Sequence, residues 1–174
     1  SKVSLPDHGL VSLEPGGQLE FSSAPKASFM EAMDQFERYL ALLDELQKRY
    51  GFHCFYGGVN PVHTLEQIGL VTANERYRMM DAYYPTTGTM GRRMMRQSCS
   101  VQVSFDFKDR AMGEKLLRTA FYVAPFVAAL FANSPFVDGR PPGYRSFRAP
   151  IWCNTDPSRE GPVPGFSRPS FGFD

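Results

Sequence analysis

The chain has 174 residues, of which 43% are hydrophobic and 14% aromatic, and this suits one packed domain and excludes a disordered chain. Its 19 Lys and Arg residues balance 18 Asp and Glu residues, so no overall electrostatic field favours nucleic acid or an anionic membrane. Contact with either partner would need a local patch of charge.

Cysteine usage and apolar runs predict the compartment. Cys54, Cys99 and Cys153 are odd in number and form no CxxC pair, which argues against a disulfide framework and against a zinc site. The longest apolar run, residues 119–132, is too short to span a bilayer, and the N-terminus shows no signal pattern. We therefore expect a soluble, cytoplasmic protein.

The first predicted element is a β-hairpin in the stretch SLEPGGQLEFS, residues 12–22. Apolar and polar side chains alternate on both sides of a Pro-Gly-Gly turn, so Leu19 and Phe21 face one way while Glu14 and Glu20 face the other. A solvated outer face is one interpretation of this acidic face, because half-exposed antiparallel sheets are common. A metal or substrate face is the other interpretation.

Three helices are predicted after the hairpin. A capping pattern at residues 28–31 opens a long amphipathic helix that runs up to Gly51 and packs on the sheet. A second helix covers residues 74–84 and is ended by Pro85. The third, over residues 109–132, is apolar on nearly all sides, so we expect it to be buried.

Two further strands are predicted, over residues 52–56 and 98–107. In the second, apolar side chains alternate with polar ones that include Gln102, and Cys99 lies on the apolar face as part of the core. Together with the hairpin, this strand could form one polar sheet surface with helices behind it. The expected class is α+β, with a shallow platform open to ligand.

Arginines gather in two places that could bind anions. Residues 84–96 combine glycine, hydroxyl groups and arginine, which can cradle an anion, but they match neither a Walker A loop nor GxGxxG. A solvated turn with a basic helix start explains them equally well. The same alternative applies to Arg145, Arg148 and Arg159 near Trp152, where arginine beside an aromatic ring can be simple stacking.

Four stretches together resemble one known family. They are SLEPGGQLEFSSAP, YYPTTGTMGRRMMRQSCSVQVSFDF, LFANSPFVDGRPPGYRSFRAPIW and DPSREG. In order and spacing, over nearly the whole chain, they resemble the plant and proteobacterial class of glutamate–cysteine ligases. The resemblance implies that residues 1–174 are a single domain, the core portion of a catalytic domain. It also implies a glutamine-synthetase-like fold, an antiparallel sheet with helices on one face and a polar active-site face.

The activity that the resemblance implies is an ATP-dependent ligation. The γ-carboxylate of glutamate is joined to the amine of cysteine through a γ-glutamyl phosphate, the first step of glutathione biosynthesis. Mg²⁺ and ATP are the implied cofactor and co-substrate, and the partners are these small molecules, with no nucleic acid and no membrane. Carboxylates suit such a site because Mg²⁺ prefers oxygen ligands.

Metal and nucleotide roles follow from the resemblance for three residues. Glu20 is the implied Mg²⁺ ligand, and Glu14 is a second one. Gln102 corresponds to a position that reaches the metal or the nucleotide in related ligases. Among these three residues, the two glutamates are also the ones that the hairpin pattern places on its acidic face.

Substrate and catalytic roles follow for four residues. Arg96 resembles a clamp for a glutamate carboxylate, and Gln18 stands beside the implied substrate site. Arg148 and Arg159 resemble phosphate or carboxylate ligands that offset charge during phosphoryl transfer.

Departures from the family pattern leave alternatives open. Ser104, Arg92 and Arg93 differ from the residues of the plant enzymes, so another amine or the ergothioneine pathway is an alternative. Family members are longer, so a core fragment or a natural short relative is expected. The alternative function is a non-catalytic remnant that binds glutamate or nucleotide. Unpaired sheet edges would then favour self-association or pairing with a complementing chain.

Overall fold

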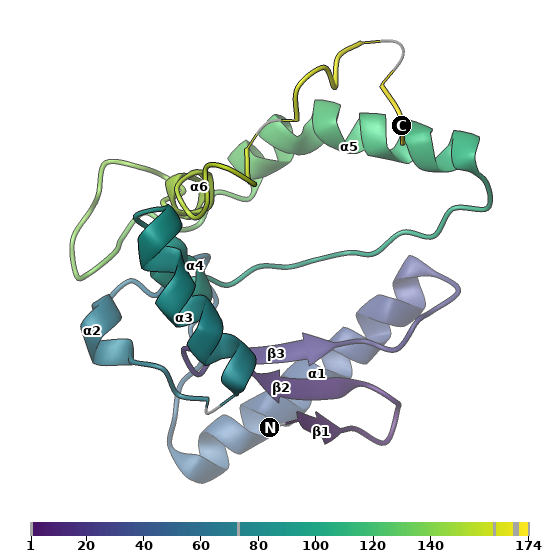
Figure 1. Ribbon diagram of the computed structural model, residues 1–174. Coiled ribbons are helices and arrows are strands. Elements are labelled where there is room, and N and C mark those ends of the chain that lie inside the picture. Colours follow the sequence, from purple (N-terminus) through teal and green to yellow (C-terminus); the bar gives the residue numbers. More distant parts are fainter. Residues whose placement is uncertain (1, 73, 162, 169–170, 174) are drawn as a thin grey trace.

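A small antiparallel sheet and a set of helices make up the computed structural model, which describes residues 2–72, 74–161, 163–168 and 171–173. The strands lie in the order β1-β2-β3 (Figure 1), and the predicted α+β class is confirmed. The strands are β1 (Lys2–Ser4), β2 (Leu10–Leu13) and β3 (Leu19–Ser22). The helices are α1 (Phe29–Tyr50), α2 (Leu65–Ile68), α3 (Glu75–Thr87), α4 (Gly91–Gln97), α5 (Arg110–Leu130) and α6 (Arg148–Cys153).

The predicted hairpin is confirmed as β2 and β3. Ser12 pairs with Glu20 and Val11 with Phe21, so the acidic residue lies on the face opposite the phenylalanine. Gly17 closes the turn with a φ of 85°, a left-handed conformation that glycine adopts without strain. The apolar face packs on α1, where the ring of Phe21 stacks on Tyr39 with centroids 4.4 Å apart.

Helix α1 forms as its end signals predict. The Ser28 hydroxyl accepts a hydrogen bond from the backbone N–H of Glu31, and Gly51 ends the helix in the left-handed region. At the centre of its buried face lies Gln35, whose amide donates to the carbonyl of Asp7 at 3.0 Å and accepts from the N–H of Ala24 at 3.1 Å. A polar side chain therefore joins the helix to the turn between β1 and β2 and to the chain that leaves β3.

Helix α3 runs two residues beyond the Pro85 that was expected to end it, so that predicted boundary is wrong. Proline has no N–H to donate to the carbonyl four residues earlier, which belongs to Asp81. The side chain of Arg92 on α4 donates to this carbonyl instead, at 3.0 Å, and the N–H of Gly88 bonds to Tyr84 to close the last turn. The contact with α4 compensates for the proline.

A second small core lies beside α4 and α6. Val59, Val137 and Ile151 are buried there. The backbone N–H groups of Thr89 and Met90, in the glycine-rich turn before α4, both donate to the carbonyl of Asn154. These two amides are therefore occupied by the protein itself and are not presented to an anion.

The strands predicted over residues 52–56 and 98–107 are absent from the described structure. Between α4 and α5, residues 99–107 run extended and alone (Figure 1), with 93% of Val101 and 73% of Phe105 exposed. The prediction that Cys99 lies in the core is also wrong, because this residue is exposed. Alternation selects an extended backbone, but a strand also needs a neighbouring strand to bond, and no backbone hydrogen bond joins residues 100–107 to another described residue.

Helix α5 forms where predicted but is not buried. Leu130 is 79% exposed, and contacts come mainly from the C-terminal segment, where Phe166 and Phe171 pack on Phe121. An all-round apolar helix needs cover on every side, and the described part of the chain covers one side of it. None of the described helices is long and apolar enough to cross a membrane.

We expect Phe21→Ala to lower the free energy of unfolding by about 2 kcal/mol, roughly half the cost of truncating a fully buried phenylalanine, because the ring is half-buried against α1. Leu19→Ala is the matched control on the same face of β3. Leu19 is 42% exposed, so its loss should cost less than about 1 kcal/mol. Urea denaturation measures both values, and equal costs would contradict the packing described.

Candidate functional site

Two carboxylates meet on the polar face of the hairpin. Glu20 on β3 accepts a hydrogen bond from the Ser12 hydroxyl at 3.4 Å, and Glu14 accepts one from the Tyr77 hydroxyl of α3 at 3.1 Å. Burial, and then the Glu20 carboxylate beside it, raise the pKa of Glu14, while the Tyr77 hydroxyl acts in the opposite direction. The pair therefore concentrates negative charge that a cation would neutralise.

These oxygens suit Mg²⁺, which is often held by one or two carboxylates together with water and substrate phosphates. The donors available on this face are the carboxylates of Glu14 and Glu20. In the described residues, no three side chains of the His, Cys, Asp and Glu types form a cluster that could hold a metal ion. The hairpin therefore fits a partial metal site that needs oxygens from elsewhere.

Gln18 connects the hairpin turn to the end of α4. Its side-chain oxygen accepts from the N–H of Gly16 at 2.9 Å, and its nitrogen donates to the carbonyls of Met95 at 3.3 Å and Ser98 at 3.1 Å. Gly16 permits this approach, because a Cβ there would lie 2.0 Å from the carbonyl oxygen of Arg96. The structure thus places Gln18 as a joint between elements, and its contact with substrate stays a prediction.

Arg96 belongs to α4 and pairs with Asp81 of α3. Only 12% of its side chain is exposed, and its buried Nε has no hydrogen-bond partner. Arg92 also approaches Asp81, at 3.4 Å, so one carboxylate serves two guanidinium groups. Asp81 is not predictable from the sequence, because its partners lie 11 and 15 residues away and no local pattern marks the pair.

Arg148 begins α6 and lies over the ring of Trp152, 5.1 Å from its centroid. No carboxylate of the described residues forms an ion pair with it, and its buried Nε has no hydrogen-bond partner. Burial lowers the pKa of its guanidinium, because the cation loses hydration and no nearby carboxylate compensates for that loss. Trp152 is 37% exposed, so it acts as a platform for the arginine as much as a core residue.

Arg159 differs from Arg148 because it has an acidic partner. Its Nε and Nη2 both lie 2.6 Å from the Asp156 carboxylate. Asp156 is buried and also accepts from the hydroxyls of Ser158 at 2.6 Å and Tyr83 at 3.0 Å. The Ser158 hydrogen bond and then those from Arg159 and Tyr83 lower the pKa of Asp156 to about 2. The spacing of Asp156 and Arg159 in the sequence could have indicated this pair.

The backbone at the end of α4 lies between the hairpin turn and Arg148. Ser98 receives the Gln18 hydrogen bond, and the next N–H, of Cys99, donates to the carbonyl of Gly58 at 3.0 Å. A Cβ on Gly58 would lie 3.5 Å from the Arg148 side chain. The structure thus brings Gln18 close to Arg96 and links both, through this backbone, to Arg148.

Gln102 is not joined to these groups. It lies in the exposed extended segment, and its amide donates to the Ser100 hydroxyl at 3.4 Å.

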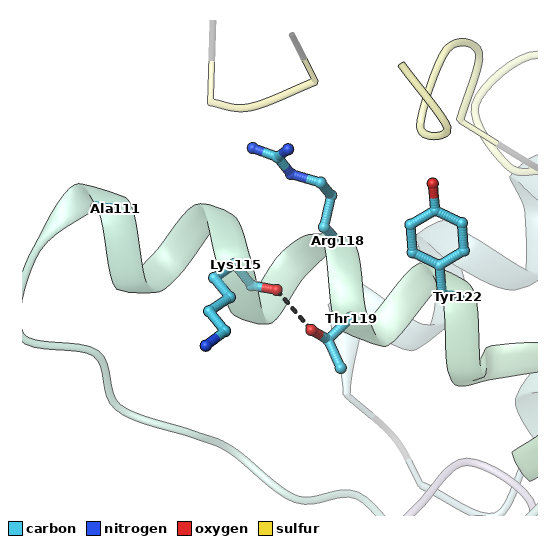
Figure 2. A pocket seen from close by; sticks show the side chains of 5 residues that line it. All are labelled: Ala111, Lys115, Arg118, Thr119 and Tyr122. Atoms are coloured by element: carbon cyan, nitrogen blue, oxygen red, sulfur yellow. Dashed lines mark hydrogen bonds between the residues drawn. The ribbon is translucent and has the colours of Figure 1, made fainter. Parts of the chain in front are cut away.

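A shallow depression of about 380 Å³ also lies apart from the predicted residues, on α5. Figure 2 shows its lining, where Arg118 and Tyr122 point toward the C-terminal segment and the Thr119 hydroxyl donates to the Lys115 carbonyl. None of the predicted site residues lines it.

Comparison with known proteins assigns the family. Residues 1–174 match the profile of Glutamate-cysteine ligase family 2 (GCS2), and the chain belongs to this family. It is 37% identical over 164 residues to the chloroplastic glutamate–cysteine ligases of Nicotiana tabacum and Arabidopsis thaliana, covering 94% of this chain and 31% of each relative. Chloroplastic glutamate–cysteine ligase A of Oryza sativa subsp. japonica is 36% identical over the same share of this chain and 33% of its own length. The chain spans about a third of these relatives.

The raised pKa of Glu14 predicts a pH-dependent effect of Glu14→Gln. The folded state penalises the ionised carboxylate, so the free energy of unfolding of the unmutated chain falls as pH rises through the folded pKa. Gln removes this penalty and still accepts from Tyr77. Without added metal, we expect the variant to be more stable than the unmutated chain at pH 7, with the difference shrinking toward about pH 4.

Urea denaturation across this pH range measures the effect. Glu37→Gln on the exposed surface of α1 is the control for loss of one negative charge. A Glu14→Gln variant that is less stable than the unmutated chain at pH 7 would show that the Glu14 charge is favourable, contrary to the electrostatics of the pair.

Proposed function

We propose that this chain forms part of the catalytic region of an ATP-dependent ligase that joins the glutamate γ-carboxylate to the amine of cysteine through a γ-glutamyl phosphate. This reaction is the first step of glutathione biosynthesis. The observation that carries the proposal is the match of all 174 residues to the glutamate–cysteine ligase family, together with the names of its plant relatives. The geometry supports roles for particular residues within that reaction.

Arg148 is the residue whose environment best suits an anionic ligand. A half-buried guanidinium without a carboxylate partner has lost hydration that a phosphate or a carboxylate would replace with charge-assisted hydrogen bonds. Arg159 is already paired with Asp156. In phosphoryl transfer its guanidinium would contact the ligand and the Asp156 carboxylate at the same time. Arg148 is therefore a cation without a carboxylate partner among the described residues, whereas Arg159 is a cation that is paired with one.

Glu14 and Glu20 would hold Mg²⁺ in this proposal. When bound, the metal ion would offset the negative charge of the ATP phosphates. The chain's own contribution is to keep the two carboxylates together, through the hairpin register and the hydroxyl groups of Ser12 and Tyr77.

The remaining roles concern substrates. Arg96 would share its guanidinium between Asp81 and a glutamate carboxylate, and Gln18 would fix the turn beside it. A nucleotide role for Gln102 requires that the extended segment lie against the hairpin. The proposal includes a glutamine-synthetase-like sheet with a polar active-site face, which requires more strands than β1, β2 and β3.

We expect the isolated chain, supplied with ATP, Mg²⁺, glutamate and cysteine, to form little or no γ-glutamylcysteine. The described residues gather two carboxylates on the hairpin, which are too few for a triphosphate and its metal ions. ADP release coupled to dipeptide formation measures this. Glutamate-dependent turnover by the chain alone would show that its own residues complete the site.

A chimera tests the function itself. We expect the chain, substituted for the matching third of the tobacco relative, to support dipeptide formation. In that chimera Arg148→Ala should lower kcat/KM by about 10²-fold or more. Arg145→Ala, which removes an exposed arginine nearby, should stay within about twofold. A folded but inactive chimera, or unchanged turnover of Arg148→Ala, would contradict the proposal.

A further inference from the structure

One carboxylate on α3 serves two arginines of α4. Asp81 accepts a hydrogen bond from Arg96 through one carboxylate oxygen, and its other oxygen lies 3.4 Å from Nη2 of Arg92. Among the described residues, no other carboxylate forms an ion pair with either arginine. Two positive charges therefore share one negative charge, and the group lacks one anion.

The neighbouring arginine of α4 has a complete partner. Arg93 donates from its two Nη atoms to the two oxygens of Asp138, at 3.0 and 2.6 Å, so one cation meets one anion. Arg92 makes no such bidentate contact. Its Nε donates to the backbone carbonyl of Asp81 at 3.0 Å, and 43% of its side chain is exposed. The end of the Arg92 guanidinium is therefore accessible to a ligand from solvent.

This unbalanced group lies one helical turn from the acidic pair of the hairpin. Tyr77 and Asp81 are four residues apart on α3, so their side chains share one face of the helix. Tyr77 donates to Glu14 at 3.1 Å, and Asp81 contacts the two arginines. A ligand with one carboxylate on these arginines would therefore lie close to the carboxylates that are proposed to hold Mg²⁺.

We propose that Arg92 is a further substrate-binding residue, which together with Arg96 binds the carboxylate of glutamate that does not react. The ligand supplies the missing anion: Arg96 stays on Asp81, and the exposed end of Arg92 donates to the incoming carboxylate. This inference rests on the proposed ligase function and adds a specificity to it. A substrate with two carboxylates is favoured, because the carboxylate that is phosphorylated cannot also neutralise the arginines.

The chimera with the tobacco relative tests this role. Arg92→Gln should raise the KM for glutamate about tenfold, as expected for the loss of one hydrogen bond to a charged group, and should leave the KM for ATP within about twofold. Arg92→Lys keeps the positive charge and should raise the KM for glutamate by about threefold or less.

Arg93→Gln is the matched control on the same helix. It breaks the bidentate pair with Asp138, so it disturbs the fold more than Arg92→Gln does. Its KM for glutamate should nevertheless stay within about twofold, because Arg93 has no charge left for a ligand to balance.

Glutamate binding without turnover gives a second measurement. Added glutamate should raise the unfolding midpoint of the unmutated chimera and of Arg93→Gln, and should raise that of Arg92→Gln much less. Equal glutamate binding by Arg92→Gln and the unmutated chimera, an equal loss in Arg93→Gln, or no shift by glutamate in any of these proteins would overturn the inference. A chimera that binds glutamate through Arg92 without forming the dipeptide would contradict the ligase function and still support the inference.

Discussion

The hydrogen bonds of the Gln18 amide are the contact on which the rest of this structure depends. They join a turn in the N-terminal sheet to the last residues of α4, about 80 residues later in the chain. The missing side chain of Gly16 allows the two backbones to approach. Because the carboxylates of the hairpin and the arginines of α4 extend from the two sides of this contact, their relative positions are set by backbone geometry rather than by flexible side chains.

Charge is distributed unevenly among the arginines that the family resemblance singled out. Arg96 and Arg159 each contact a carboxylate that is largely buried, and such pairs are costly to separate. Arg148 is desolvated without such a partner. Removing hydration from a cation costs free energy, and perturbed groups of this kind gather at functional sites. The difference separates two arginines that are paired within the protein from one that has no carboxylate partner among the described residues.

Local signals predicted the hairpin and α1 correctly. The alternation around the turn, the hydroxyl of Ser28 and the glycine at position 51 each act within a few residues, so the sequence alone contains the whole cause. The acidic pair on the hairpin was predictable for the same reason. Its hydrogen bond from Tyr77 was not, because it depends on how α3 packs against the sheet.

Burial could not be predicted for residues 99–107 or for α5. An apolar pattern indicates that a segment favours burial. Whether other parts of the chain bury it depends on the tertiary fold, which the pattern does not determine. Asp81 was missed for a related reason, since it becomes the partner of Arg92 and Arg96 only when the fold brings α3 and α4 together, whereas Asp156 lies three residues from its partner Arg159. The chain spans about a third of the length of its plant relatives.

Asp81 has a mechanical consequence that extends beyond charge. Its backbone carbonyl, left without a helical donor by Pro85, accepts from Arg92, and its side chain binds Arg96. One residue of α3 thus grips α4 at two successive turns, through its backbone and its side chain. Rotation of α4 about its own axis would break both attachments at once, so Asp81 fixes the orientation of α4 relative to α3. Helix α4 also contacts the hairpin turn and α6, so Asp81 helps to set the relative positions of both.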